Sequence, residues 1–64
     1  MTETQSLGDR IREAREARKI SLRQLAREAK ISAPYLFDLE YGRRENASPA
    51  VLLRLGRCLK VRLT

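Results

Sequence analysis

The segment from 21 to 29 constrains the fold of this chain most, because it carries a helix start signal and a complete helical face. Ser21 is suited to cap a helix, and Gln24, three residues later, completes a capping box. Apolar residues then recur at i, i+3, i+4 and i+7, the spacing of one face of a helix, at Leu22, Leu25, Ala26 and Ala29. The pattern predicts a short helix over about 22–29.

A second start signal follows within a few residues. Ser32 is suited to cap the next helix, over about 33–41, and Leu36 and Leu39 give that helix a buried stripe. Two short helices joined by a tight turn, here at about 22–41, have the spacing of a helix-turn-helix. The second helix of that motif enters the major groove of DNA.

The flanking segments predict further helices. A first helix, running to about Lys19, has its apolar face at Leu7, Ile11 and Ala14. A fourth helix begins at Ser48 and Pro49, a cap followed by a residue suited to the first helical position, and its buried face is made by Val51, Leu52, Leu55, Cys58 and Leu59. Val61 and Leu63 look like the lead-in to a fifth helix, so the chain could be a fragment of a longer protein.

Composition agrees with one small globular domain over 1–64, in which the polar residues 1–5 are expected to fray. Hydrophobic residues make up 42% of the chain and charged residues 34%, which is not the composition of a disordered segment. Neither a transmembrane run nor a signal peptide is evident, and one cysteine allows no internal disulfide. We therefore expect a cytoplasmic protein, associated with the nucleoid.

The charge balance points to a polyanionic partner. Fourteen basic residues against eight acidic ones give a formal net charge of +6, although many small solvated domains are basic as well. The sequence has no histidine, no nucleophile with a matching base, no glycine-rich phosphate loop and no cluster of metal ligands. We expect neither an enzyme nor a metal or cofactor site.

From Leu7 to Leu63 the chain resembles the phage-repressor and Cro-like family of helix-turn-helix domains, also called the XRE family. The residues that carry the resemblance are 7–12 (LGDRIR), Ser21 with Leu25 and Ala26, Ile31 and Ser32, Tyr35 and Leu36, Leu39 and Glu40, 42–44 (GRR), and Ser48 with Pro49. The resemblance implies an all-α, four- to five-helix lambda-repressor-like domain. It also implies sequence-specific binding of double-stranded DNA by a bacterial or phage transcriptional regulator, a repressor that binds a palindromic operator as a homodimer.

Three turn positions need a backbone that is unusual for most residues. Gly42 is placed to end the third helix in a left-handed conformation. Relatives usually have glycine where this chain has Lys19 and Lys30. Either these lysines adopt a positive φ at a cost of roughly 1 kcal/mol each, or the turns differ slightly.

By resemblance, the outward face of the third helix reads the DNA bases, and the candidates are Ala33, Pro34, Phe37 and Asp38. Tyr41 lies on the same face. Ala33 and Phe37 could contact thymine methyl groups, and Asp38 could accept a hydrogen bond from a cytosine amino group. The alternatives are that Phe37 packs against a dimer partner and that Asp38 is only solvated.

Phosphate contacts are expected around this helix, and the candidates are Leu22, Arg23, Ser32, Tyr35, Arg43, Arg44 and Asn46. The N-terminus of the second helix, at Leu22 and Arg23, presents free N–H groups. Relatives often have glutamine in place of Leu22, so a side-chain contact there is in question. Tyr35 could instead pack half-buried, and the segment from Arg43 to Asn46 could be a solvated basic loop.

Arg15 and Glu40 match an arginine and a glutamate that form an ion pair in the family and position the recognition helix. Arg15 could also contact a phosphate. The alternative is two independent surface charges. Cys58 is expected to be a buried small hydrophobic residue and not a reactive thiol.

Two other functions remain open from the sequence. One is the DNA-binding module of an antitoxin whose toxin-binding part lies outside this chain. The other is a helical protein-interaction module with no role in DNA binding.

Overall fold

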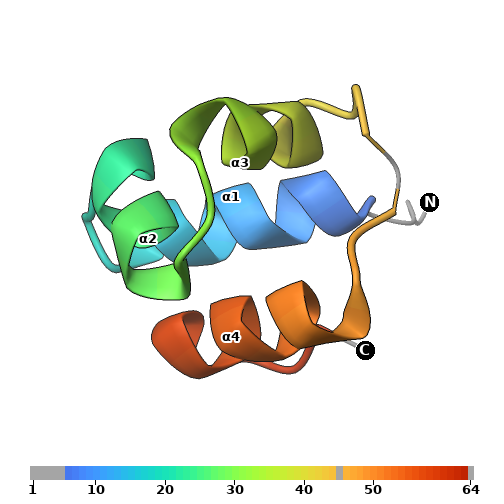
Figure 1. Ribbon diagram of the computed structural model, residues 1–64. Helices are drawn as coiled ribbons and strands as arrows, with labels where there is room; N and C mark the ends of the chain where they lie inside the picture. Colours follow the sequence, from blue (N-terminus) through green and yellow to red (C-terminus); the bar gives the residue numbers. More distant parts are fainter. Residues whose placement is uncertain (1–5, 45, 64) are drawn as a thin grey trace, which may run out of the picture.

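The computed structural model describes residues 6–44 and 46–63, and these form four helices and no strand. Helix α1 spans Leu7–Ala17, α2 spans Leu22–Ala29, α3 spans Ala33–Glu40 and α4 spans Pro49–Leu59 (Figure 1). The predicted all-α fold and the helix-turn-helix are therefore confirmed. The expected fraying of 1–5 lies outside the described residues.

Two predicted helix ends are wrong by one or two residues. Helix α1 ends at Ala17 and not near Lys19, because Arg18 is the C-cap and Lys19 turns left-handed. Helix α3 ends at Glu40, with Tyr41 as its C-cap. The described residues after α4 are not helical, and Leu63 is buried in the core. The predicted lead-in to a fifth helix stays a prediction, because the described residues end at 63.

Each helix begins with a serine cap. The Oγ atoms of Ser6, Ser21, Ser32 and Ser48 accept hydrogen bonds, 3.0 to 3.2 Å long, from the N–H groups three residues further along. Such a cap stabilises a helix by about 1 kcal/mol relative to alanine. The second half of the predicted capping box does not form: the Ser21 N–H makes no hydrogen bond to Gln24 within the described residues, and the side-chain amide of Gln24 donates instead to Glu28 at 3.3 Å.

A left-handed residue follows each of the four helices. Lys19 has a φ of 58° and Lys30 a φ of 61°, so of the two alternatives the strained turn is the one that occurs. Gly42, with a φ of 79°, follows α3 as predicted. A third lysine, Lys60, ends α4 in the same conformation. These turns keep the connections short, so α1, α2 and α3 pack around a common core.

The core joins all four helices. It consists of Ile11, Leu25, Ala26, Ala29, Leu36, Leu39, Val51, Leu55, Leu59 and Leu63. Cys58 and Leu52, predicted to be buried, are only partly buried and pack against this cluster. Figure 1 shows α3 and α4 on opposite sides of α1, so one face of α3 is left without a covering helix.

A close approach between α1 and α3 fixes the position of α3. Gly8 is buried, and a Cβ atom at this position would collide with the backbone carbonyl oxygens of Leu39 and Glu40. Gly8, Arg12 and Arg15 are spaced i, i+4 and i+7, which puts them on one stripe of α1. That stripe faces the C-terminal end of α3.

Candidate nucleic-acid interface

The face of α3 that points away from the core is the first part of the candidate interface. Pro34 and Phe37 are exposed, and Ala33 and Asp38 are partly exposed. No hydrogen bond within the described residues engages the Asp38 carboxylate; its backbone carbonyl accepts from the N–H groups of two loop residues. The structure thus brings the four predicted base-reading residues to one accessible surface.

Phe37 is not isolated on this surface. Its ring centroid lies 4.6 Å from that of Tyr41, with the ring planes tilted by 37°. Phe37 is 44% exposed and Tyr41 is 53% exposed. They form an aromatic patch at the C-terminal half of α3.

Arg15 and Glu40 form the predicted ion pair. Nε of Arg15 donates to Oε2 of Glu40 at 2.8 Å, and Nη2 donates to Oε1 at 3.0 Å. The Glu40 side chain is fully buried, whereas 12% of the Arg15 side chain is exposed. The bond to the Glu40 carboxylate raises the pKa of Arg15 above its already high ordinary value, so the guanidinium is always charged.

Arg15 also ties α1 to the start of α2, because its Nη1 donates to the backbone carbonyl of Ile20 at 3.0 Å. One guanidinium therefore links α1, the segment before α2, and the last residue of α3. With so many donors engaged inside the protein, the side chain has little surface left for a phosphate.

Sequence reasoning missed Arg12. Its Nη1 donates to the backbone carbonyl of Glu40 at 2.9 Å, which satisfies a carbonyl at the end of α3, and its Nη2 contacts Asp9 at 2.7 Å. The guanidinium also lies 5.3 Å from the centre of the Tyr41 ring. The hydrogen bond from Arg12 lowers the pKa of Asp9. The i, i+3 spacing of Asp9 and Arg12 could have predicted the ion pair within α1. It could not have predicted the contact between Arg12 and α3.

The phosphate candidates fall into three groups. Around the start of α2, Leu22 has no polar side-chain atom and packs partly buried against the core, so only its backbone N–H group can donate, while Arg23 is exposed. At the start of α3, Ser32 is exposed and its Oγ is engaged as the cap. In the loop after α3, Arg43 and Asn46 are exposed.

Tyr35 and Arg44 contact each other. Tyr35 is partly buried and packs against the core, which is the packing role left open by the sequence. The guanidinium of Arg44 lies 4.8 Å from the centre of the Tyr35 ring, a cation–π contact that restrains an otherwise exposed side chain. The loop cation is therefore held beside the first turn of α3.

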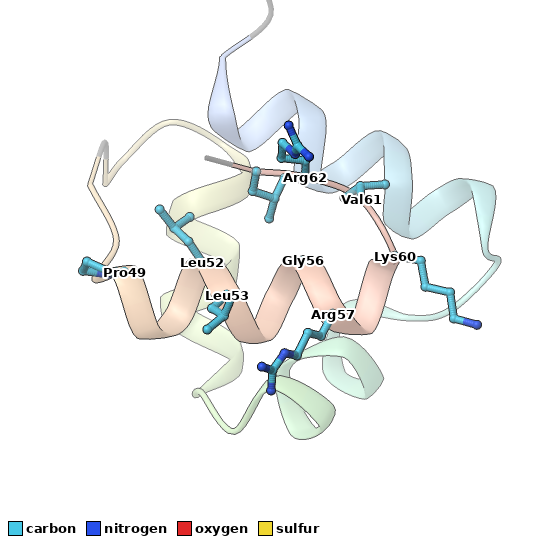
Figure 2. A pocket seen from close by; sticks show the side chains of 9 residues that line it. Pro49, Leu52, Leu53, Gly56, Arg57, Lys60, Val61 and Arg62 are labelled. Carbon is cyan, nitrogen blue, oxygen red and sulfur yellow. The ribbon is translucent and has the colours of Figure 1, made fainter.

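A separate hollow lies between α4 and the tail (Figure 2). It is about 640 Å³ in volume, and its lining includes Leu52, Leu53, Val61, Arg57 and Arg62. The lining carries apolar and basic groups and no acidic one. Because the hollow borders α4, it lies on a different side of the domain from the α3 face.

The remaining chemistry of the described residues is limited. They contain no group of histidine, cysteine or acidic side chains that could hold a metal ion. No helix among them has the length and apolar character needed to cross a bilayer. Burial raises the pKa of the Cys58 thiol, so this group stays protonated at neutral pH.

Residues 6–63 match a protein family described as helix-turn-helix domain. The chain belongs to this family. The resemblance to the phage-repressor and Cro-like group is also confirmed by solved structures. The N-terminal DNA-binding domain of SinR from Bacillus subtilis is 30% identical with a TM-score of 0.85, and the match covers 89% of this chain and 83% of that one.

A second similar structure is the P22 c2 repressor in complex with a synthetic operator. It is 28% identical with a TM-score of 0.86, over 94% of this chain and 89% of that one. Among curated proteins, the HTH-type transcriptional repressor RghR of Bacillus subtilis (strain 168) is 35% identical over 89% of this chain. The chain spans about two fifths of the length of the curated relatives it matches, covering 42% and 39% of them.

Proposed function

We propose that this chain is the sequence-specific DNA-binding domain of a transcriptional repressor. The observation that carries the proposal is the placement of α3. Buried contacts from Arg15 and Gly8 fix its inner side against α1, and its outer side carries exposed side chains. A helix held in this way can enter the major groove without rearrangement.

The charge distribution supports the same function. Exposed cations at Arg23, Arg43 and Arg44 lie before and after α3 in the chain, where they would contact the DNA backbone on either side of the groove. The free N–H groups at the N-terminus of α2 would bind one phosphate. Phosphate contacts fix the register, and the outer face of α3 would then read the bases.

Base reading by this α3 would rest on apolar contact more than on bidentate hydrogen bonds. Arg, Gln and Asn, the residues suited to bidentate readout, are absent from 33–41. Ala33 and Phe37 would contact thymine methyl groups, and Asp38 would accept from a cytosine amino group. We therefore expect an operator half-site in which thymines and one cytosine are the positions under strongest selection.

The mode of DNA binding is inferred from the similar proteins. Solved relatives are bound to DNA, one of them to an operator, and a curated relative is a transcriptional repressor. We propose that this chain likewise binds a palindromic operator as a homodimer, one subunit on each half-site, about 34–36 Å apart on one face of the duplex. Repression would then follow from occupancy of a promoter.

Selection of bound sequences from random duplex DNA tests this function. We expect an enriched palindrome whose half-sites are separated by about one helical turn. The matched variants are Arg43→Ala, in the proposed interface, and Arg57→Ala, on α4. Both remove one exposed arginine, so only the first should weaken binding clearly. No enrichment, or equal loss in both variants, would contradict the proposal and favour a protein-interaction module.

A further inference from the structure

Three contacts hold the Arg12 guanidinium in one place. It donates to the Asp9 carboxylate at 2.7 Å and to the carbonyl of Glu40 at 2.9 Å, and it lies 5.3 Å from the centre of the Tyr41 ring. Its side chain is 26% exposed. A planar guanidinium can make these contacts together, because its donors point outward in its plane while its face stacks on a ring.

The Tyr41 ring, which contacts Arg12, also packs against the Phe37 ring. The two residues are one helical turn apart, and their ring centroids are 4.6 Å apart. Both are exposed, so the core does not fix either ring. A continuous row of contacts thus runs from α1, through Arg12 and Tyr41, to an aromatic side chain on the outer face of α3.

We propose that Arg12 and Tyr41 are positioning residues that hold the Phe37 ring in one orientation and thereby make it selective for a thymine methyl group. This inference rests on the proposed function. An exposed phenylalanine on a helix would otherwise sample several rotamers, and binding would have to order it. A ring that is already ordered meets the methyl group at no such cost.

The row of contacts also explains why exposed aromatic groups are tolerated here. Phe37 supplies the contact surface, the Tyr41 ring packs against it, and Arg12 joins Tyr41 to the α1–α3 junction. Arg12 itself is directed at Asp9 and at the end of α3, so its effect on base reading is indirect. Selectivity at this position therefore depends on a residue of α1 that does not contact the base.

The test replaces thymine by deoxyuridine, one position at a time, in the operator obtained by selection. Loss of one buried methyl group lowers affinity about fourfold, and we expect that ratio at one position for the unaltered protein. Phe37→Ala should bring the ratio to about one. Tyr41→Leu and Arg12→Lys should bring it close to one as well. The first variant removes the ring that contacts Phe37, and the second removes the planar guanidinium that holds that ring, while the Phe37 side chain remains in both. Tyr41→Phe, which keeps the ring, should retain the full ratio.

A measurement without DNA separates positioning from loss of fold. Three-bond NMR couplings in the free, unaltered protein should show one χ1 rotamer for Phe37. In Tyr41→Leu and Arg12→Lys the same couplings should show averaged rotamers, while the far-UV circular dichroism spectrum stays unchanged and so shows that the fold is kept. Averaging in the unaltered protein overturns the proposal. So does a full thymine preference in Tyr41→Leu, or in Phe37→Ala. If the unaltered protein binds no duplex selectively, the proposed function itself fails, and that outcome is distinct from all of these.

Discussion

Replacing the Arg15–Glu40 pair by apolar side chains should reveal how α3 is held. In Arg15→Met the apolar stem is kept, but the fully buried Glu40 carboxylate loses both hydrogen bonds from the guanidinium, at 2.8 and 3.0 Å. Leaving a buried charge without its partner costs about 3–5 kcal/mol. A domain of this size has a stability of only about 3–10 kcal/mol, so the variant should be close to unfolding.

Glu40→Leu should cost less than Arg15→Met. Arg15 keeps its bond to the carbonyl of Ile20 at 3.0 Å, and it retains some contact with water because its side chain is 12% exposed. The double variant removes the charges together with their desolvation cost, so its stability should lie well above that expected from the sum of the single losses. We expect a coupling free energy of about 1–3 kcal/mol.

Urea denaturation followed by far-UV circular dichroism measures these differences, with the m-value as a check that unfolding stays two-state. Arg15→Met can be measured in a stabilising osmolyte, applied equally to all four proteins. A coupling below about 0.5 kcal/mol would refute the reasoning, because that value belongs to exposed pairs that do not hold two helices together. If the pair positions α3, the folded double variant should also bind its operator more weakly.

Four further predictions concern other parts of the domain. Arg43→Ala and Arg44→Ala should weaken binding to all duplexes alike, and each should flatten the slope of log K against log salt by about one unit in titrations. Asp38→Ala should change base preference at one operator position by ~1–3 kcal/mol in competition assays; a uniform loss across sequences would show that the carboxylate is not a reader. Gly8→Ala should lower the free energy of unfolding by ~1–3 kcal/mol despite the better helix propensity of alanine, because its Cβ meets two carbonyl oxygens. Cys58 should react slowly with iodoacetamide at neutral pH in the folded protein. Folding raises the pKa of this thiol, so the stability that the buried, protonated thiol contributes is complete at neutral pH. That contribution is lost as the pH rises past 9.0, the ordinary pKa of the thiol. Equal alkylation rates in folded and unfolded protein would contradict this prediction.

Much of the fold could be predicted from the sequence because its signals act within one helical turn. The serine caps at Ser21, Ser32 and Ser48 each bind an N–H group only three residues away. Helical periodicity likewise placed Leu36 and Leu39 inside, and hence the opposite face of α3 outside. The exposed face of the candidate interface follows from that same geometry.

The Arg15–Glu40 pair needed more than local pattern, and it was predicted from the resemblance to a known family. The two residues are 25 positions apart, and nothing near either one indicates the other. Burial of a glutamate is also unfavourable unless a cation is close by, so hydropathy alone would have placed Glu40 at the surface.

The contacts between α1 and α3 could be seen only in the tertiary structure. Arg12 and the carbonyl of Glu40 are 28 positions apart, and their contact depends on the approach that Gly8 permits. The pairing of Arg12 with Tyr41 depends on the same crossing. Local sequence determines which face of each helix is apolar, but the angle and depth at which two helices meet depend on all the side chains between them. The sequence alone therefore placed Phe37 on the outer surface, and the packing of α1 against α3 determined which residues support its ring.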